Sequence, residues 1–67
     1  METFAERLRE LRKDRLLSQE ALSKETGIGR PCISRWEANQ TIINGQQLIV
    51  LAKYFNVSTD YLLGLVD

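Results

Sequence analysis

The sequence contains no histidine, a single cysteine, one proline and one tryptophan, and its formal net charge at pH 7 is zero. A lone cysteine cannot form an intramolecular disulfide, and without histidine it cannot complete a zinc site, so we expect neither a metal nor a cofactor. The chain also has no glycine-rich phosphate loop and too few residues to enclose a substrate. These absences predict a protein that is not an enzyme.

The N-terminal stretch METFAERLRELRKDR carries charges throughout and contains no apolar run. It therefore does not have the pattern of a signal peptide or a membrane anchor, and a single cysteine fits a reducing compartment. We expect a cytoplasmic protein with no membrane partner. With 67 residues, of which 43% are hydrophobic and 27% charged, the whole chain, residues 1–67, is expected to form one domain around one core.

The balance of charge gives conflicting indications about nucleic acid. A zero net charge and a sequence pI of about 6.2 fall well short of the basic balance typical of DNA-binding domains. The distribution is uneven, however, because eight of the nine basic residues lie at or before Arg35 and only Lys53 follows. If the fold makes a basic face, the first half of the chain must build it.

Hydrophobic spacing and local end signals predict five short helices and no strand, which is an all-α domain. TFAE at the start of the chain has the pattern of a capping box, and serine or asparagine caps are expected at Ser18, Asn44 and Ser58. Gly27 is expected to end the second helix. The expected helical ranges are about 3–15, 19–26, 30–38, 45–55 and 59–64.

Leu48, Leu51, Ala52 and Phe55 share one face of the fourth predicted helix, which should turn toward the core. Leu62 and Leu63 of the last helix should close that core. Cys32 is expected to be a small, partly buried filler. Asn39 is a residue type that tolerates the left-handed conformation that ends a helix, so the third helix should end before it.

The second and third predicted helices are separated by only about three residues, with glycine in the turn. This is the pattern of two helices that cross steeply, a helix-turn-helix at about 18–37. On a helical wheel of the third helix, Ile33 and Trp36 fall together and are expected to anchor it to the core. The opposite face is short and polar and carries Pro31, Ser34, Arg35 and Ala38, with Arg30 at its margin.

Such an outward face suits the major groove of B-DNA, where arginine can donate two hydrogen bonds to the O6 and N7 atoms of guanine. Arg30 and Arg35 are therefore candidate base contacts. The alternative is that both are solvated surface charges, as most arginines on helices are. Helical spacing alone does not decide between the two.

The motifs LSQEAL, GI, ISRWE and VSTDYLLG occur in this order in the chain. In order and spacing they closely resemble the phage-repressor helix-turn-helix family, the Cro/cI-like or xenobiotic-response-element class of transcription regulators. The resemblance covers about residues 4–64. It implies a compact five-helix fold of the lambda-repressor type, double-stranded DNA as the partner, and action as a homodimer that occupies an operator.

The resemblance also implies roles for single residues. Ser18 and Gln19 stand where family members hold a DNA phosphate at the start of the second helix, which is a natural anion site; the alternative is that Ser18 is only a cap. Base reading is implied for Arg30, Pro31, Ser34 and Arg35. A structural salt bridge is implied between Glu37 and Arg12.

The chain departs from the family pattern mainly after the third helix, where members often carry lysine or arginine. Here the residues are Gln40, Thr41, Ile42 and Ile43, so we expect weaker phosphate binding, with Asn39 and Gln40 as neutral phosphate contacts. Leu16 replaces a usual glycine or asparagine, and Gly29 replaces a capping serine or threonine.

Several apolar residues have no clear place in this core, and an exposed apolar cluster usually marks an interface. Ile42, Ile43, Val50, Leu65 and Val66 are of this kind; the expected dimer contacts are Leu65, Val66, Ile42 and Val50. For Leu65 and Val66 the alternative is a frayed tail. The overall prediction is a sequence-specific DNA-binding regulator, more readily a repressor than an activator. Its alternative is a protein-interaction module of the same fold that has lost most DNA affinity.

Overall fold

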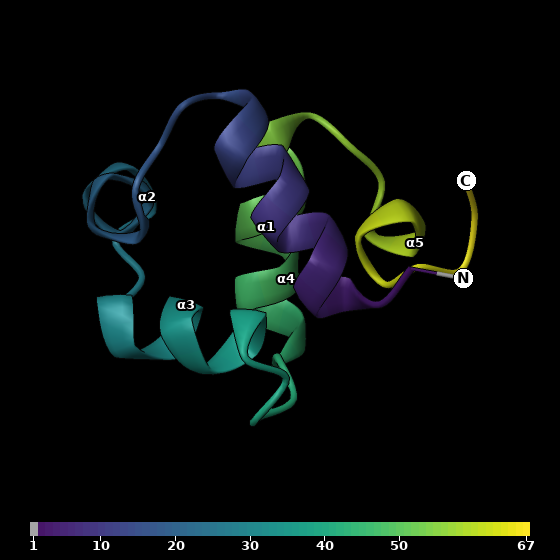
Figure 1. Ribbon diagram of the computed structural model, residues 1–67. Helices are drawn as coiled ribbons and strands as arrows, with labels where there is room; N and C mark the ends of the chain where they lie inside the picture. Colours follow the sequence, from purple (N-terminus) through teal and green to yellow (C-terminus); the bar gives the residue numbers. More distant parts are fainter. Residues whose placement is uncertain (1) are drawn as a thin grey trace.

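The computed structural model describes residues 2–67 and contains five helices in this range. Helix α1 spans Phe4–Asp14, α2 spans Gln19–Thr26, α3 spans Arg30–Glu37, α4 spans Gly45–Phe55 and α5 spans Thr59–Leu62. In Figure 1, α1 and α4 run upright through the middle of the view, with α2 and α3 to one side and α5 to the other. The all-α, five-helix prediction is confirmed.

Four of the five helices begin at a side-chain cap, as the sequence predicts. The hydroxyl of Ser18 accepts the backbone N–H of Ala21 at 3.0 Å, and the carboxamide oxygen of Asn44 accepts that of Gln47 at 2.9 Å. Ser58 caps α5 in the same way, and Thr3 forms a reciprocal capping box. Each such cap stabilises its helix by about 1 kcal/mol, because it satisfies a backbone donor with no intrahelical partner.

The helix ends use backbone in the left-handed region. Gly27 ends α2 with a φ of 76°, and Asn39 and Asn56 have φ values of 58° and 57°. Leu16, in the turn after α1, has a φ of 57° and a side chain that is 93% exposed. A branched apolar side chain is disfavoured in this conformation, so the turn is strained where glycine or asparagine would not be.

The core takes one completely buried side chain from every helix: Leu8, Leu22, Ile33, Leu51 and Leu62. α3 packs against both α1 and α2, α4 packs against α2 and α5, and α1 also contacts α5. Full burial of each of these side chains stabilises the fold by about 1.5–3 kcal/mol relative to exposure. The core therefore fixes α3 from the inside and leaves its outer face free of tertiary contacts.

The structure corrects two expectations about apolar residues. Leu63 does not close the core, because it lies just past the end of α5 and is 39% exposed, whereas its neighbour Leu62 is fully buried. Ile43 does have a core role, since its side chain is partly buried and packs against the central cluster. Leu51, Ala52 and Phe55 of α4 are buried as predicted.

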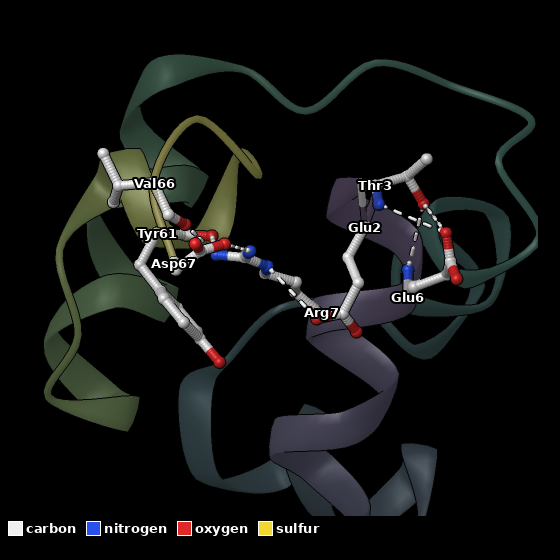
Figure 2. Close-up of polar contacts among 7 residues, drawn as sticks. All are labelled: Glu2, Thr3, Glu6, Arg7, Tyr61, Val66 and Asp67. Carbon is white, nitrogen blue, oxygen red and sulfur yellow. Dashed lines mark hydrogen bonds and ion pairs between the residues drawn. The ribbon is translucent and has the colours of Figure 1, made fainter.

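A buried arginine joins the two ends of the described chain, as Figure 2 shows. The side chain of Arg7 donates from Nη1 to the carbonyl oxygens of Tyr61, at 2.8 Å, and Val66. Its guanidinium lies 4.2 Å from the centre of the Tyr61 ring and forms ion pairs at 3.8 Å with Glu2 and with Asp67. Arg7 is only 4% exposed. The residue thus holds the C-terminal segment against α1.

Candidate nucleic-acid interface

The helix-turn-helix is formed by α2 and α3, which pack directly on one another across a turn of three residues, 27–29. Pro31 lies in the first turn of α3, where its missing N–H costs no helical hydrogen bond. The N-cap residue of α3 is Gly29, which has no side chain to cap the helix. The position of α3 is therefore set by its buried face rather than by its N-terminal end.

Two residues of that buried face anchor α3. Ile33 is fully buried, and Trp36 is 3% exposed with its ring packed edge-on against Phe4 of α1, at 6.3 Å between ring centres. Trp36 therefore serves the core and presents no free ring face for a base to stack on. Cys32 beside them is partly buried against the core.

All four predicted base-reading side chains, Arg30, Pro31, Ser34 and Arg35, are exposed on the other face of α3. Within residues 2–67, neither arginine is engaged in an ion pair or a side-chain hydrogen bond. Two guanidinium groups and two short side chains therefore project from one helix without partners among residues 2–67. Such a face can enter a groove about 12 Å wide and donate to base edges.

Arg12 and Glu37 form the structural salt bridge that the family resemblance implies. The guanidinium donates from Nε to Glu37 Oε2 and from Nη2 to Oε1, both at 2.7 Å, and from Nη1 to the carbonyl of Leu17 at 2.8 Å. The Arg12 and Glu37 side chains are 12% and 4% exposed. The hydrogen bonds with Glu37 raise the pKa of Arg12 above its ordinary value, and burial opposes this rise. This two-bond pair ties the end of α3 to α1.

The predicted phosphate contacts lie in different surroundings. Ser18 is exposed and its hydroxyl accepts a backbone N–H in the cap. Gln19 is partly buried, and its Nε2 donates to Glu37 Oε1 at 3.3 Å, so it joins the salt bridge. Asn39 and Gln40 are exposed in the loop after α3. No sequence pattern predicts the contact between Gln19 and Glu37.

An open hollow lies where α1, α2 and α3 meet. It is lined by Gln19, Ser34 and Glu37 together with three basic residues of α1, namely Arg9, Arg12 and Lys13. Arg9 donates from Nη2 to the carbonyl oxygen of Glu37 at 2.6 Å. No sequence motif gives a role to Arg9 or Lys13. Their spacing of four residues, which places them on one helix face, was the available signal.

The four predicted dimer contacts are all on the surface. Ile42 is 95% exposed, Leu65 66%, Val66 48% and Val50 40%. They come from the loop after α3, the middle of α4 and the segment after α5. Three further apolar side chains, Leu16, Ile49 and Leu63, are also exposed.

Comparison with known proteins agrees with this architecture. Residues 8–62 match the model of a family described as helix-turn-helix, and the chain belongs to this family. The chain is similar to repressor protein C2 of Salmonella phage P22, with 42% identity over 60 residues, which are 90% of this chain and 28% of that protein. It is also similar to the uncharacterized HTH-type transcriptional regulator YobD of Bacillus subtilis (strain 168), with 38% identity over 64 residues, or 96% of this chain and 57% of that protein. The chain thus spans only part of the length of these two relatives.

The solved structures include a close match to the whole domain. The crystal structure of the P22 c2 repressor protein in complex with a synthetic operator superposes with a TM-score of 0.89 and 38% sequence identity. The match covers 98% of this chain and 100% of that chain. The identity is high enough for the likeness to concern the family and not only the arrangement of helices.

None of the helices in residues 2–67 combines the length and the apolar character needed to cross a lipid bilayer.

Proposed function

We propose that this protein is a sequence-specific transcription regulator that binds double-stranded DNA by inserting α3 into the major groove. The observation that carries the proposal is the division of α3 into two faces. Ile33 and Trp36 hold one face to the core, while Arg30, Pro31, Ser34 and Arg35 are exposed on the other. The likeness to a repressor solved in complex with operator DNA supports the same reading.

In this proposal each outward residue of α3 makes a different kind of contact with the DNA bases. Arg30 and Arg35 donate to base edges, Ser34 donates or accepts at short range, and Pro31 makes apolar contact with a thymine methyl group. Ser18, Gln19, Asn39 and Gln40 hold the phosphate backbone and set the register of α3 in the groove. The salt bridge between Arg12 and Glu37 keeps α3 at a fixed angle to α1.

The proposal includes a homodimer, because two copies on a symmetric operator read half-sites about 34–36 Å apart. Leu65, Val66, Ile42 and Val50 are the proposed contacts, and their exposure is the observation that favours them. A dimer that covers an operator excludes other proteins from that DNA, so we propose that the protein represses transcription. The relatives come from a phage of Salmonella and from a bacterium, whose DNA lies in the cytoplasm, and we propose the same location for this protein.

Selection from a random DNA pool tests the main proposal. The chain should enrich one short sequence, and Arg30→Ala should relax the preference at one base position by about 1–3 kcal/mol. Gln19→Ala should instead weaken binding to every sequence by a similar factor. Lys53→Ala, on α4 and outside the candidate interface, is the control and should change neither property.

Two results would contradict the proposal. Failure of the unmodified chain to bind any DNA at low salt would leave a protein-interaction module of the same fold as the better description. Identical, uniform losses from Arg30→Ala and Gln19→Ala would show that Arg30 does not read bases. Sedimentation of the chain on the selected DNA tests the dimer: two copies per symmetric site are expected, and Leu65→Asp should reduce this to one.

A further inference from the structure

A row of cations on α1 borders the face of the protein that carries α3. Arg9, Arg12 and Lys13 of α1 line the same hollow as Ser34 of α3 and Gln19 of α2. Residues four apart on a helix are neighbours on its surface, so Arg9 and Lys13 form one edge of this hollow. The loop after α3, with Gln40, Thr41 and Ile42, brings no positive charge to the interface.

The charges lining the hollow do not cancel. Glu37 is its one acidic residue, and its carboxylate is engaged by Arg12 through two hydrogen bonds. Arg9 donates to the carbonyl oxygen of Glu37, a neutral group, and within residues 2–67 no carboxylate lies at ion-pair distance from it. Lys13 is exposed and has no ion pair within residues 2–67. Two positive charges therefore remain at the edge of the hollow.

The acids of α1 lie outside this hollow. Glu6, Glu10 and Asp14 are spaced by four residues and form a row of their own, and none of them lines the hollow. Like charges at this spacing destabilise an isolated helix, and each row of α1 carries such a repulsion. Glu6 and Glu10 are three residues from Arg9 and Lys13, so the two rows are adjacent on the helix, and the positive row is the one that borders α2 and α3.

We propose that Arg9 and Lys13 bind phosphate groups of the DNA strand that borders the groove entered by α3, in the place of cations that the loop after α3 lacks. The proposal rests on the proposed function and extends it to α1. The hydrogen bond between Arg9 and the carbonyl of Glu37 fixes one end of the guanidinium, which leaves its other nitrogens oriented for a phosphate. Lys13 adds a mobile point charge four residues further along.

The salt dependence of binding to a random-sequence duplex tests this inference. The logarithm of the binding constant falls with the logarithm of salt concentration, with a slope of about −0.9 for each phosphate neutralised. Lys13→Gln should make the slope shallower by about 0.9 and weaken binding about eightfold at about 0.1 M salt. Lys13 is exposed, so its replacement leaves the fold intact. Lys53→Gln removes the same charge from α4 and should leave the slope unchanged.

Arg9 is tested with a pair of variants because it also bonds to the end of α3. Arg9→Gln should reduce the slope as Lys13→Gln does, and Arg9→Lys, which keeps the charge, should restore it. If Lys13→Gln and Arg9→Gln both bind DNA with the same slope as the unmodified chain, the role proposed for α1 is wrong. The proposed function would not be affected by that result. If the unmodified chain does not bind the duplex at any salt concentration, the proposed function fails, and this inference fails with it.

Discussion

Replacing the Arg12 and Glu37 pair by apolar residues tests whether this salt bridge fixes α3 as the structure indicates. The side chains of Arg12 and Glu37 are only 12% and 4% exposed. Removing either one therefore leaves the charge of the other buried without a partner. The loss of one partner from a buried pair destabilises a protein by about 3–5 kcal/mol. A domain of 67 residues has a total stability of roughly 3–10 kcal/mol, so either single variant should lose a large part of it.

The double replacement should behave differently from the sum of the single ones. Arg12→Met and Glu37→Leu should each lower the free energy of unfolding by about 3 kcal/mol, and thereby the melting temperature by about 12–24 °C. The double variant strands no charge. It loses the hydrogen bonds from Arg12 to the carbonyl of Leu17 and from Gln19 to Glu37, so it should cost only about 2 kcal/mol, well below the sum of the two single losses. Urea unfolding of all four proteins at pH 7 measures these differences.

A matched control pair is available on the surface of α2. Lys24 and Glu20 are 3.9 Å apart and four residues apart in sequence, with side chains 79% and 65% exposed. The same exchange, Lys24→Met and Glu20→Leu, should change stability by less than about 0.5 kcal/mol per variant, because water solvates both charges. Losses at Arg12 and Glu37 that simply add in the double variant would refute the reasoning, since additive losses mean that the two charges do not depend on each other.

Three further predictions concern the backbone and pH. Leu16→Gly should raise the free energy of unfolding by about 0.5–1 kcal/mol because it relieves a left-handed backbone, and calorimetry should show no such gain for Leu16→Ala. Gly64→Ala should destabilise the domain by at least about 2 kcal/mol, because the φ is 80° and the new Cβ would lie 2.3 Å from the carbonyl oxygen of Glu2; Gly45→Ala, with open space around it, serves as the control in chemical unfolding. Hydrogen bonds in the N-terminal capping box lower the pKa of Glu6, so stability that is present above its unfolded pKa is lost as pH falls through the folded value. Glu6→Gln keeps the capping box but cannot titrate, so the free energy of unfolding should depend less on pH below about pH 5. An unchanged pH dependence in unfolding experiments would contradict the role of Glu6.

The helices could be predicted from the sequence because the signals at their ends are local. A serine such as Ser18 or an asparagine such as Asn44 reaches a backbone N–H three residues away, and Gly27 supplies the left-handed residue after α2. None of these interactions depends on distant parts of the chain. The predicted ranges therefore agree with the observed ones to within about two residues, as is usual for helix ends.

The errors and omissions concern contacts between distant segments. Leu63 and Leu62 are adjacent and equally apolar, and only the packing of α5 determines that one is buried and the other exposed. Arg7 joins residues more than fifty positions away, which no spacing rule reveals. Helical period alone predicts that the arginines of α3 face outward. The hollow that Ser34 lines also needs Arg9 and Lys13 of α1, and the approach of these two residues to α3 is a property of the fold.

The joining of the two ends through Arg7 has a practical consequence for work with this domain. Both ends of the described chain, residues 2–67, lie next to α5, and α3 lies on the other side of the molecule in Figure 1. A donor and an acceptor dye attached to the two ends would sit close together and away from the residues proposed to read DNA. Their energy transfer would fall when the contact between α1 and the C-terminal segment opens, even while the core remains folded. The fluorescence of the buried Trp36, recorded alongside, would report on the core, so the two signals together would separate local opening of this contact from global unfolding.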